Sequence, residues 1–158
     1  MAVSIRRATV EDLDLIVPLF DAYRQFYRQQ PDLDLARTFL SDRFRHHQSV
    51  IFLALDAAMD DNGSALGFTQ LYPSFSSVLA RPIYILNDLF VAPTARRRKV
   101  ARRLLETAAE FGKQSGAARL GLSTALDNAP ARALYESCGW RQDNVFCTYT
   151  LPLDAESR

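Results

Sequence analysis

Apolar side chains recur every three or four positions between residues 13 and 27, which is the period of a helix with one buried face. Thr9 and Asp12 precede this run, where a helix N-cap and its acidic third position belong. Pro18 lies inside the run and is expected to bend or divide the helix, because proline removes a backbone hydrogen bond. A second amphipathic helix is expected from about Asp34 to His46.

Runs of β-branched, aromatic and other apolar residues predict strands between segments of turn-forming residues. We expect strands over residues 3–7, at an edge, and over 50–55, 65–71, 83–91, 120–125 and 145–151. The sequence Asp-Asp-Asn-Gly at residues 60–63 predicts a hairpin turn between the second and third of these strands. The small residues and two aromatics of segment 72–77 predict a loop before the fourth strand.

Two further helices alternate with the later strands. The first follows a basic run that begins at Arg96, and it carries apolar residues at helical spacing as far as Phe111. The second opens near Asn128, has Pro130 in its first turn and has Gly139 as its expected C-cap. Two helices, an antiparallel meander and then alternating strands and helices predict an α/β fold, with a mixed central sheet of roughly six to seven strands flanked by about four helices.

Length and composition indicate one domain. The chain has 158 residues with 48% hydrophobic content, so we expect a single domain over 1–153 and a loose tail over 154–158. Lys and Arg number 19 against 18 acidic residues, which argues against general nucleic-acid binding. Two cysteines without histidines at metal spacing suggest neither a disulfide scaffold nor a metal site. Without a signal peptide or membrane span, the expected location is the cytoplasm.

The basic run lies where a helix begins. Six of the eight residues from Arg96 to Arg103 are basic. Cations at a helix N-terminus are unfavourable without a counter-charge, whereas the unpaired N–H groups there favour an anion, so the run predicts a polyphosphate ligand. The alternative is a solvated, partly salt-bridged helix face, because several charged residues fall three or four positions apart: Arg98, Arg102, Glu106, Glu110 and Lys113.

The last helix presents two polar side chains in one direction. Asn128 and Tyr135 are seven residues apart, with Ala131 or Arg132 between them, and this spacing predicts a shared helix face. A side-chain amide and a phenol therefore point the same way. A phenol has a pKa near about 10, so Tyr135 is able to donate a proton at neutral pH. Taken alone, a helical tyrosine is more often a core aromatic.

At these two segments the chain resembles the GCN5-related N-acetyltransferase (GNAT) family. Arg96 and Ala101 match the ends of the family motif Gln/Arg-x-x-Gly-x-Gly/Ala at the start of a long helix. The second motif, Asn-x-x-Ala-x-x-Leu-Tyr-x-x-x-Gly-Phe/Trp, is matched by Asn128, Ala131, Leu134, Tyr135, Gly139 and Trp140. Lys99 occupies the position of the middle glycine of the first motif. A lysine forced into a left-handed conformation would cost about 1–2 kcal/mol, and its Cβ would crowd the phosphates.

The resemblance covers nearly the whole chain and implies acetyl-CoA as the acyl donor. In this fold the strand ending at Val91 and the strand near Leu120 splay apart, and the coenzyme enters the gap. The residues that the resemblance assigns to the coenzyme are Leu89, Phe90, Val91, Arg96, Arg97, Arg98, Lys99, Val100, Ala101, Arg102, Asn128 and Ala131. Tyr135 is then the proton donor to the departing thiolate, and the backbone near Leu89 and Phe90 polarises the carbonyl.

The general base is expected near the end of the same strand, at Asp88 or Asn87. Strand alternation predicts that these two side chains point to opposite faces. Some polyamine-acting relatives carry Glu at the position of Asn87, so a water chain is an alternative to a carboxylate there. Asp88 is equally consistent with a structural acceptor for loop backbone.

The acceptor is expected to be a primary amine, small and cationic or amino-acid-like, that attacks directly in a ternary complex. The resemblance places Tyr23, Tyr27, Tyr72 and Phe75 along its binding site. An antibiotic or a peptide amine remains open as the acceptor. The fold commonly dimerises, often through its C-terminal strands, so a homodimer is expected.

Two other classes of function stay open at this point. Lys99 in the pyrophosphate turn is consistent with a non-catalytic acyl-CoA-binding or regulatory relative. The cluster from Arg96 to Arg103 is also consistent with a nucleic-acid-binding module. Such a module predicts steep salt dependence and no competition by acetyl-CoA.

Overall fold

The computed structural model describes residues 2–59 and 64–157, and its internal contacts divide the chain into two compact units, Met1–Ser123 and Thr124–Arg158. The hairpin turn expected over 60–63 lies outside the described residues. The first unit contains β1 (Val3–Arg7), η1 (Val10–Asp12), α1 (Leu13–Phe26), α2 (Leu33–Arg45), β2 (Val50–Asp56), β3 (Ala65–Ser76), β4 (Arg81–Val91), η2 (Pro93–Ala95), α3 (Val100–Gln114) and β5 (Leu120–Gly121). The second unit contains α4 (Ala129–Ser137).

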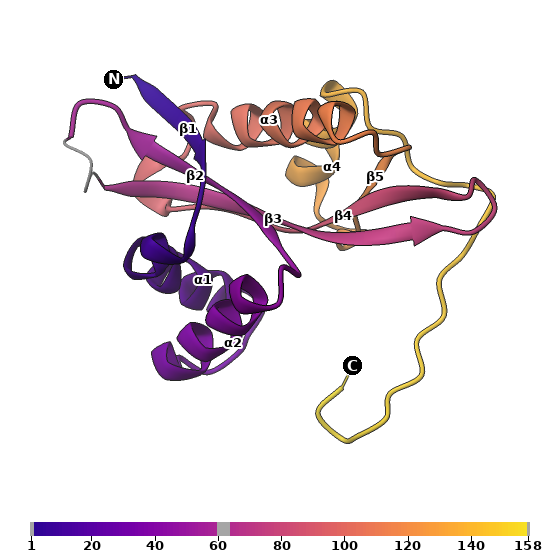
Figure 1. Ribbon diagram of the computed structural model, residues 1–158, viewed down its shortest axis with the longest axis horizontal. Coiled ribbons are helices and arrows are strands. Elements are labelled where there is room, and N and C mark those ends of the chain that lie inside the picture. The colour runs from indigo at the N-terminus through magenta and orange to yellow at the C-terminus, as the bar shows by residue number, and fades with distance from the viewer. Residues whose placement is uncertain (1, 60–63, 158) are drawn as a thin grey trace. The chain divides into compact units, whose positions relative to one another are not determined.

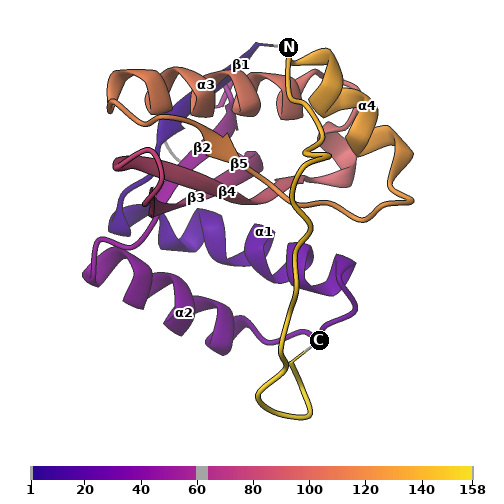
Figure 2. The ribbon, with the colours of Figure 1, turned by 90° about the vertical axis from the view of Figure 1, so that its right-hand side faces the viewer.

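The first unit is a sheet between two helical layers. Its five strands lie in the order β1-β2-β3-β4-β5, with antiparallel pairing from β1 to β4 and parallel pairing of β4 with β5. Helices α1 and α2 pack together on one face and α3 covers the other (Figures 1 and 2). The mixed sheet and the four helices were predicted, and both are confirmed among the described residues.

The predicted number of strands, six to seven, is wrong for the described residues. The sheet has five strands, and segment 145–151 forms no strand. The strand expected over 120–125 is reduced to Leu120–Gly121. Strand-forming side chains favour a strand only where a neighbouring strand pairs with them, and the composition of a segment does not specify its neighbour.

The loop predicted over 72–77 is also wrong over most of its length. Strand β3 continues to Ser76 and forms a long hairpin with β4, which starts at Arg81. Pro73 is tolerated because β2 begins at Val50, opposite Leu71, and leaves the rest of β3 with a strand partner on one side only. Tyr72 and Phe75 are therefore strand residues.

The start of the first helix follows the local signals in the sequence. Thr9 and Asp12 form the predicted capping box, with Thr9 N–H donating to Asp12 Oδ2 at 2.8 Å, but this box caps η1, which leads directly into α1. Pro18 lies inside α1, but the helix runs unbroken from Leu13 to Phe26, so the expected division does not occur. The second helix begins and ends within a residue of its predicted bounds.

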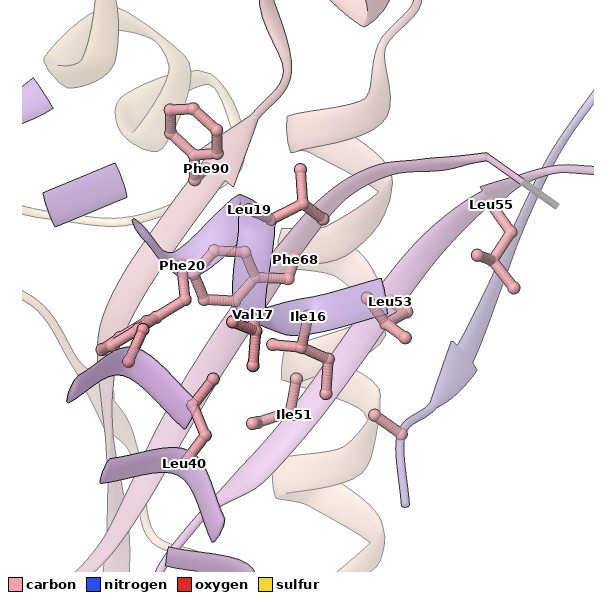
Figure 3. Packing of buried hydrophobic residues seen from close by; sticks show 12 residues of the cluster. Ile16, Val17, Leu19, Phe20, Leu40, Ile51, Leu53, Leu55, Phe68 and Phe90 are labelled. Atoms are coloured by element: carbon pink, nitrogen blue, oxygen red, sulfur yellow. The ribbon is translucent and has the colours of Figure 1, made fainter. Parts of the chain in front are cut away.

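A cluster of buried apolar side chains lies between the sheet and the α1–α2 layer (Figure 3). Ile16 and Phe20 from α1 meet Leu40 from α2 and Phe68 from β3. Strand β2 is buried along almost its whole length because helices cover both of its faces. No helix among the described residues has the length and apolar character needed to span a membrane.

One glycine is required by the close approach of two strands. A Cβ at Gly67 on β3 would lie 2.5 Å from the carbonyl oxygen of Phe90 on β4, well inside van der Waals contact. Gly67 pairs with Val91 at the end of β4. Any larger side chain at residue 67 would therefore push away the strand end that precedes the basic turn.

The second unit is a short helix followed by an extended segment. Asn128 is the N-cap of α4, with Oδ1 accepting from Ala131 N–H at 3.2 Å. Gly139 follows the C-cap with φ +90°, as predicted for a helix-ending glycine. The irregular segment after Trp140 exposes a series of large apolar side chains, Val145, Phe146, Tyr149, Leu151 and Leu153.

Candidate functional site

A β-bulge in β4 shapes the centre of the first unit. Asp88 pairs with Gln70 and Leu86 pairs with Leu71, so Asn87 is an extra residue without a partner on β3. The prediction that Asn87 and Asp88 point to opposite faces is therefore wrong. Instead, Asn87 Nδ2 donates to Asp88 Oδ1 at 2.9 Å.

The bulge places Asp88 among neutral hydrogen-bond donors. Asp88 is 2% exposed, and Gln70 Nε2 donates a hydrogen bond to its Oδ2. No salt bridge reaches Asp88 from the described residues 2–59 and 64–157. Burial raises the pKa of the Asp88 carboxyl, and hydrogen bonds from Gln70, Asn87 and Tyr23 oppose this rise. The Asp88 carboxyl group thus accepts hydrogen bonds from side chains, whereas the sequence was also consistent with Asp88 as an acceptor for loop backbone.

Two tyrosines border this carboxyl group. Tyr23, from α1, donates a hydrogen bond to Asn87 O at 3.3 Å. Burial, and after it the Asp88 charge, raise the pKa of both the Tyr23 and Tyr72 hydroxyls far above the usual range. Both phenols therefore stay neutral and are able to donate hydrogen bonds. The structure brings together Tyr23, Tyr72, Asn87 and Asp88, four of the residues selected from the sequence.

The other two predicted acceptor residues lie further out. The ring of Tyr27 is 5.1 Å from that of Tyr23, in an edge-to-face arrangement, and Tyr27 is 51% exposed. Phe75 is 78% exposed. It is three residues beyond Tyr72 on β3, and strand alternation directs the two side chains to opposite faces. The structure therefore does not bring Phe75 into the cluster around Asp88.

Among the described residues, the end of β4 pairs with a strand on one side only. Pairing with β5 is confined to Tyr84↔Leu120 and Ile85↔Gly121, whereas pairing with β3 continues to Val91. Segment 89–91 consequently has no β5 partner, as the resemblance implies for the gap between these strands. Phe90 turns its side chain into the core, with its ring 6.4 Å from that of Tyr23.

The basic turn contains two residues in the left-handed conformation. Arg97 has φ +65° and Lys99, the N-cap of α3, has φ +59°. A left-handed conformation is unfavourable for a residue with a Cβ. The first N–H groups of α3, including those of Val100 and Ala101, have no acceptor within the helix. Basic residues in the left-handed conformation thus lie beside N–H groups for which the helix itself supplies no acceptor, which is an arrangement suited to an anion.

The arginines of this turn differ in their surroundings. Arg98 is half-buried and forms an ion pair with Asp56 of β2, with 3.5 Å between Nη2 and Oδ2. Arg103 Nη1 donates to the carbonyl oxygen of Val3. These two guanidinium groups tie the turn and helix to the sheet, while Arg96, Arg97 and Lys99 are exposed.

In the second unit, the predicted pair Asn128 and Tyr135 occupies α4 and its cap. Asn128 accepts the capping hydrogen bond through Oδ1, and this leaves its Nδ2 group as a donor. Tyr135 is half-buried, with its ring 6.2 Å from that of Trp140. The Trp140 N–H donates to Tyr135 O at 3.0 Å, which closes the helix end.

Two buried polar residues escaped the sequence analysis. Gln70 and Thr69 are both 0% exposed on β3, and Thr69 Oγ1 donates to Asp88 O at 2.8 Å. Polar residues inside a strand of otherwise apolar character were the available signal. Their contact with Asp88 depends on the register of β3 against β4, which the sequence pattern does not specify.

Comparison with known proteins adds a family. The family model described as "Acetyltransferase (GNAT) family" matches residues 15–140. The chain is 47% identical over 153 residues to "Uncharacterized N-acetyltransferase YhfO" of Bacillus subtilis (strain 168), covering 97% of this chain and 99% of the relative.

Solved structures agree with this likeness. The crystal structure of a probable acetyltransferase has a TM-score of 0.90 and 46% identity, covering 97% of this chain and 99% of the other. The aminoglycoside N-acetyltransferase AAC(6')-Iy, in complex with CoA, has a TM-score of 0.74 over 95% of each chain. At 19% identity, that second likeness concerns the fold alone.

Proposed function

The chain belongs to the GNAT family of acetyltransferases, and we propose that it transfers the acetyl group of acetyl-CoA to a primary amine by direct attack in a ternary complex. The observation that carries the proposal is the buried Asp88 beside Tyr23 and Tyr72, on the strand that leads into the basic turn. Such a carboxyl group takes up a proton more readily than an exposed carboxylate, because burial raises its pKa.

In the proposed reaction, the acceptor enters as an ammonium ion and gives a proton to Asp88. The resulting amine attacks the thioester carbonyl carbon, so a C–N bond forms and the C–S bond breaks. Backbone groups near Leu89 and Phe90 polarise the carbonyl oxygen. By the family resemblance, Tyr135 supplies the proton that the departing thiolate takes up, and the proton that the attacking nitrogen loses as the amide forms restores the Tyr135 phenol.

We assign the coenzyme to the end of β4 and the basic turn. The free backbone of segment 89–91 and the first N–H groups of α3 support this assignment. Arg96, Arg97 and Lys99 add positive charge at the same turn. Asn128, through Nδ2, and Ala131 complete the proposed set of coenzyme contacts.

For the acceptor we propose a small cationic or amino-acid-like amine. A buried carboxyl group favours an ammonium ion, and the faces of neighbouring aromatic rings attract cations. Tyr23, Tyr72 and Tyr27 supply such rings near Asp88. Phe75 remains a candidate only for the outer part of a larger acceptor.

A non-catalytic acyl-CoA-binding relative is the second candidate function. It is favoured by Lys99, whose left-handed conformation removes the option of an ordinary helical backbone at that residue. The two candidates share the coenzyme and differ in turnover. They are therefore separated by measuring binding and transfer on the same protein sample.

The experiment is calorimetric titration with acetyl-CoA, followed by a thiol-release assay on a panel of small amines, amino acids and short peptides. Acetyl-CoA binding together with thiol release that requires an amine supports the transferase. Binding without release on any acceptor favours the non-catalytic relative. No binding by either the native protein or Lys99→Gly contradicts both candidates.

We also propose a homodimer formed through the segment after Trp140. Its exposed apolar side chains include Phe146, Tyr149 and Leu151, each 78% exposed or more. Such a patch on a segment that has the composition of a strand suits pairing with a second copy. Light scattering on the native protein and on a Phe146→Ser/Tyr149→Ser variant tests this: a native monomer overturns the proposal, and a native dimer that the variant dissociates supports it.

A further inference from the structure

Gln70 is an anomaly within the buried cluster around Asp88. Its side chain is 0% exposed, and Nε2 donates to Asp88 Oδ2. Its Oε1 is also buried, yet it accepts no hydrogen bond from any residue in the described part of the chain. A buried carbonyl oxygen without a donor is costly and uncommon, so its presence requires a reason.

The two ends of an amide group have nearly the same size but opposite hydrogen-bonding character. Rotation of Gln70 about its last side-chain bond exchanges Nε2 and Oε1 within almost the same volume. In one orientation Nε2 donates to an ionised Asp88, as the structure has it. In the other, Oε1 accepts the O–H of a neutral Asp88, so each protonation state has a matching amide orientation.

We propose that Gln70 is a positioning residue for acetyl transfer, whose amide holds the Asp88 carboxyl group in place both before and after it takes the proton of the acceptor. This inference rests on the proposed role of Asp88 as base. When the ammonium ion gives its proton to Asp88, the carboxylate becomes a carboxylic acid. The amide then turns from donor to acceptor.

No neighbouring charge competes with the amide for this task among the described residues. Tyr23 faces Asp88 from α1 and Tyr72 faces it from β3, both neutral. Arg43, from α2, acts on Tyr72 through its charge and stacks over Phe39 at 4.6 Å. Among the hydrogen bonds that favour ionised Asp88, the one from Gln70 has the largest effect.

The test is Gln70→Met, which keeps the length of the side chain and removes both polar atoms. Loss of the donor makes ionised Asp88 less favourable. The acidic limb of kcat/KM against pH should therefore move to higher pH by about one unit. The matched control is Thr69→Val, which removes the buried hydrogen bond to the backbone oxygen of Asp88 and should leave the limb in place.

A second readout does not require turnover. The ¹³C resonance of the Asp88 carboxyl carbon should titrate at higher pH in Gln70→Met than in the native protein, and at the native pH in Thr69→Val. Coincident titrations and coincident pH limbs in Gln70→Met and the native protein would overturn the inference. If circular dichroism shows that Gln70→Met does not fold, Gln70→Leu replaces it.

The same experiment separates the two proposals. Asp88→Asn that retains the native transfer rate would overturn Asp88 as base. A displaced carbon titration in Gln70→Met would still show that the amide is coupled to the Asp88 proton. Loss of transfer in Asp88→Asn, with displaced limb and titration in Gln70→Met, supports both.

Discussion

Asp12 and Asp88 are both buried, at 8% and 2% exposure, but their surroundings are opposite in character. Arg6 binds Asp12 through two hydrogen bonds of 2.7 and 2.8 Å, and the bond from Arg6 is the main cause that lowers the pKa of Asp12. Asp88 receives neutral amides from Gln70 and Asn87, and burial raises its pKa. A cation favours the ionised form of one carboxyl group, and burial disfavours the ionised form of the other.

The difference distinguishes a carboxylate that stabilises the fold from one that is available for chemistry. A lowered pKa means that ionised Asp12 favours the folded state, whereas a raised pKa means that ionised Asp88 opposes it. A destabilising buried acid next to neutral phenols is expected at a reactive site, because perturbed pKa values concentrate there. The following tests are designed to break this distinction.

The largest effect is expected from Asp88→Asn. Transfer should fall about 100-fold or more, because the amide cannot take the proton of the acceptor. Acetyl-CoA affinity should be unchanged, and stability at neutral pH should be equal or higher because a buried charge is removed. Thiol release, calorimetry and urea unfolding measure the three quantities. Native turnover in this variant would place Asp88 with the structural carboxylates.

Asp12→Asn should show the converse behaviour. Loss of the Arg6 pair and of the capping acceptor should lower the free energy of unfolding by about 2 kcal/mol at neutral pH, with transfer unchanged. Asp14→Asn is the control, because the Asp14 side chain is 88% exposed and pairs with Arg37 at the surface. That control should change stability by less than about 0.5 kcal/mol. Equal losses of unfolding free energy in Asp12→Asn and Asp14→Asn would show that Asp12 stabilises the fold no more than a surface carboxylate does.

The two carboxylates should also respond to different ranges of pH. The native protein should have a higher free energy of unfolding than Asp12→Asn, and this difference is fully present above the ordinary Asp pKa of 3.8. It is lost as pH falls from 3.8 through the lowered pKa of Asp12. At high pH the native protein should have a lower free energy of unfolding than Asp88→Asn. This difference should disappear as pH falls from the raised pKa of Asp88 to 3.8. Urea unfolding of the three proteins between pH 3 and pH 8, roughly the range set by these groups, measures both differences. If both stability differences disappeared over the same range of pH, the opposite pKa shifts assigned to Asp12 and Asp88 would be contradicted.

The smallest effect is expected at the basic turn, where the cost is conformational. Lys99→Gly should raise the free energy of unfolding by about 0.5–1 kcal/mol, since glycine accepts φ +59° without a Cβ penalty but loses more chain entropy on folding. Lys99→Ala is the matched control, because it removes the charge and keeps the Cβ. Thermal unfolding at low and high salt compares them. Equal stabilisation by both variants would attribute the cost to charge.

Features that depend on local sequence were predicted well. Helix α2, the capping box of Thr9 and Asp12, and the helix-ending Gly139 follow from residues close to one another in the chain. The same holds for the family, since its motif at Asn128 to Trp140 lies within one continuous segment.

Features that depend on pairing between distant segments were not predictable in this way. The contact of Gln70 with Asp88 and the bulge at Asn87 are set by the register of two strands. Segment 145–151 has the composition of a strand, but no strand among the described residues pairs with it. Pro73 suggested a break, yet an open strand side accommodates it.

The unpaired Asn87 has a consequence for insertions and deletions in this strand. Leu86 and Asp88 pair with the adjacent residues Leu71 and Gln70, so they lie on opposite faces of the sheet although Asn87 separates them in the chain. Deleting Asn87 would bring Leu86 and Asp88 next to each other in an unbroken alternation, so Asp88 would still lie opposite Gln70 and Leu86 opposite Leu71. A one-residue deletion here would therefore remove the bulge and the amide that donates to Asp88, and it would leave the acid on the face of the sheet where it now lies.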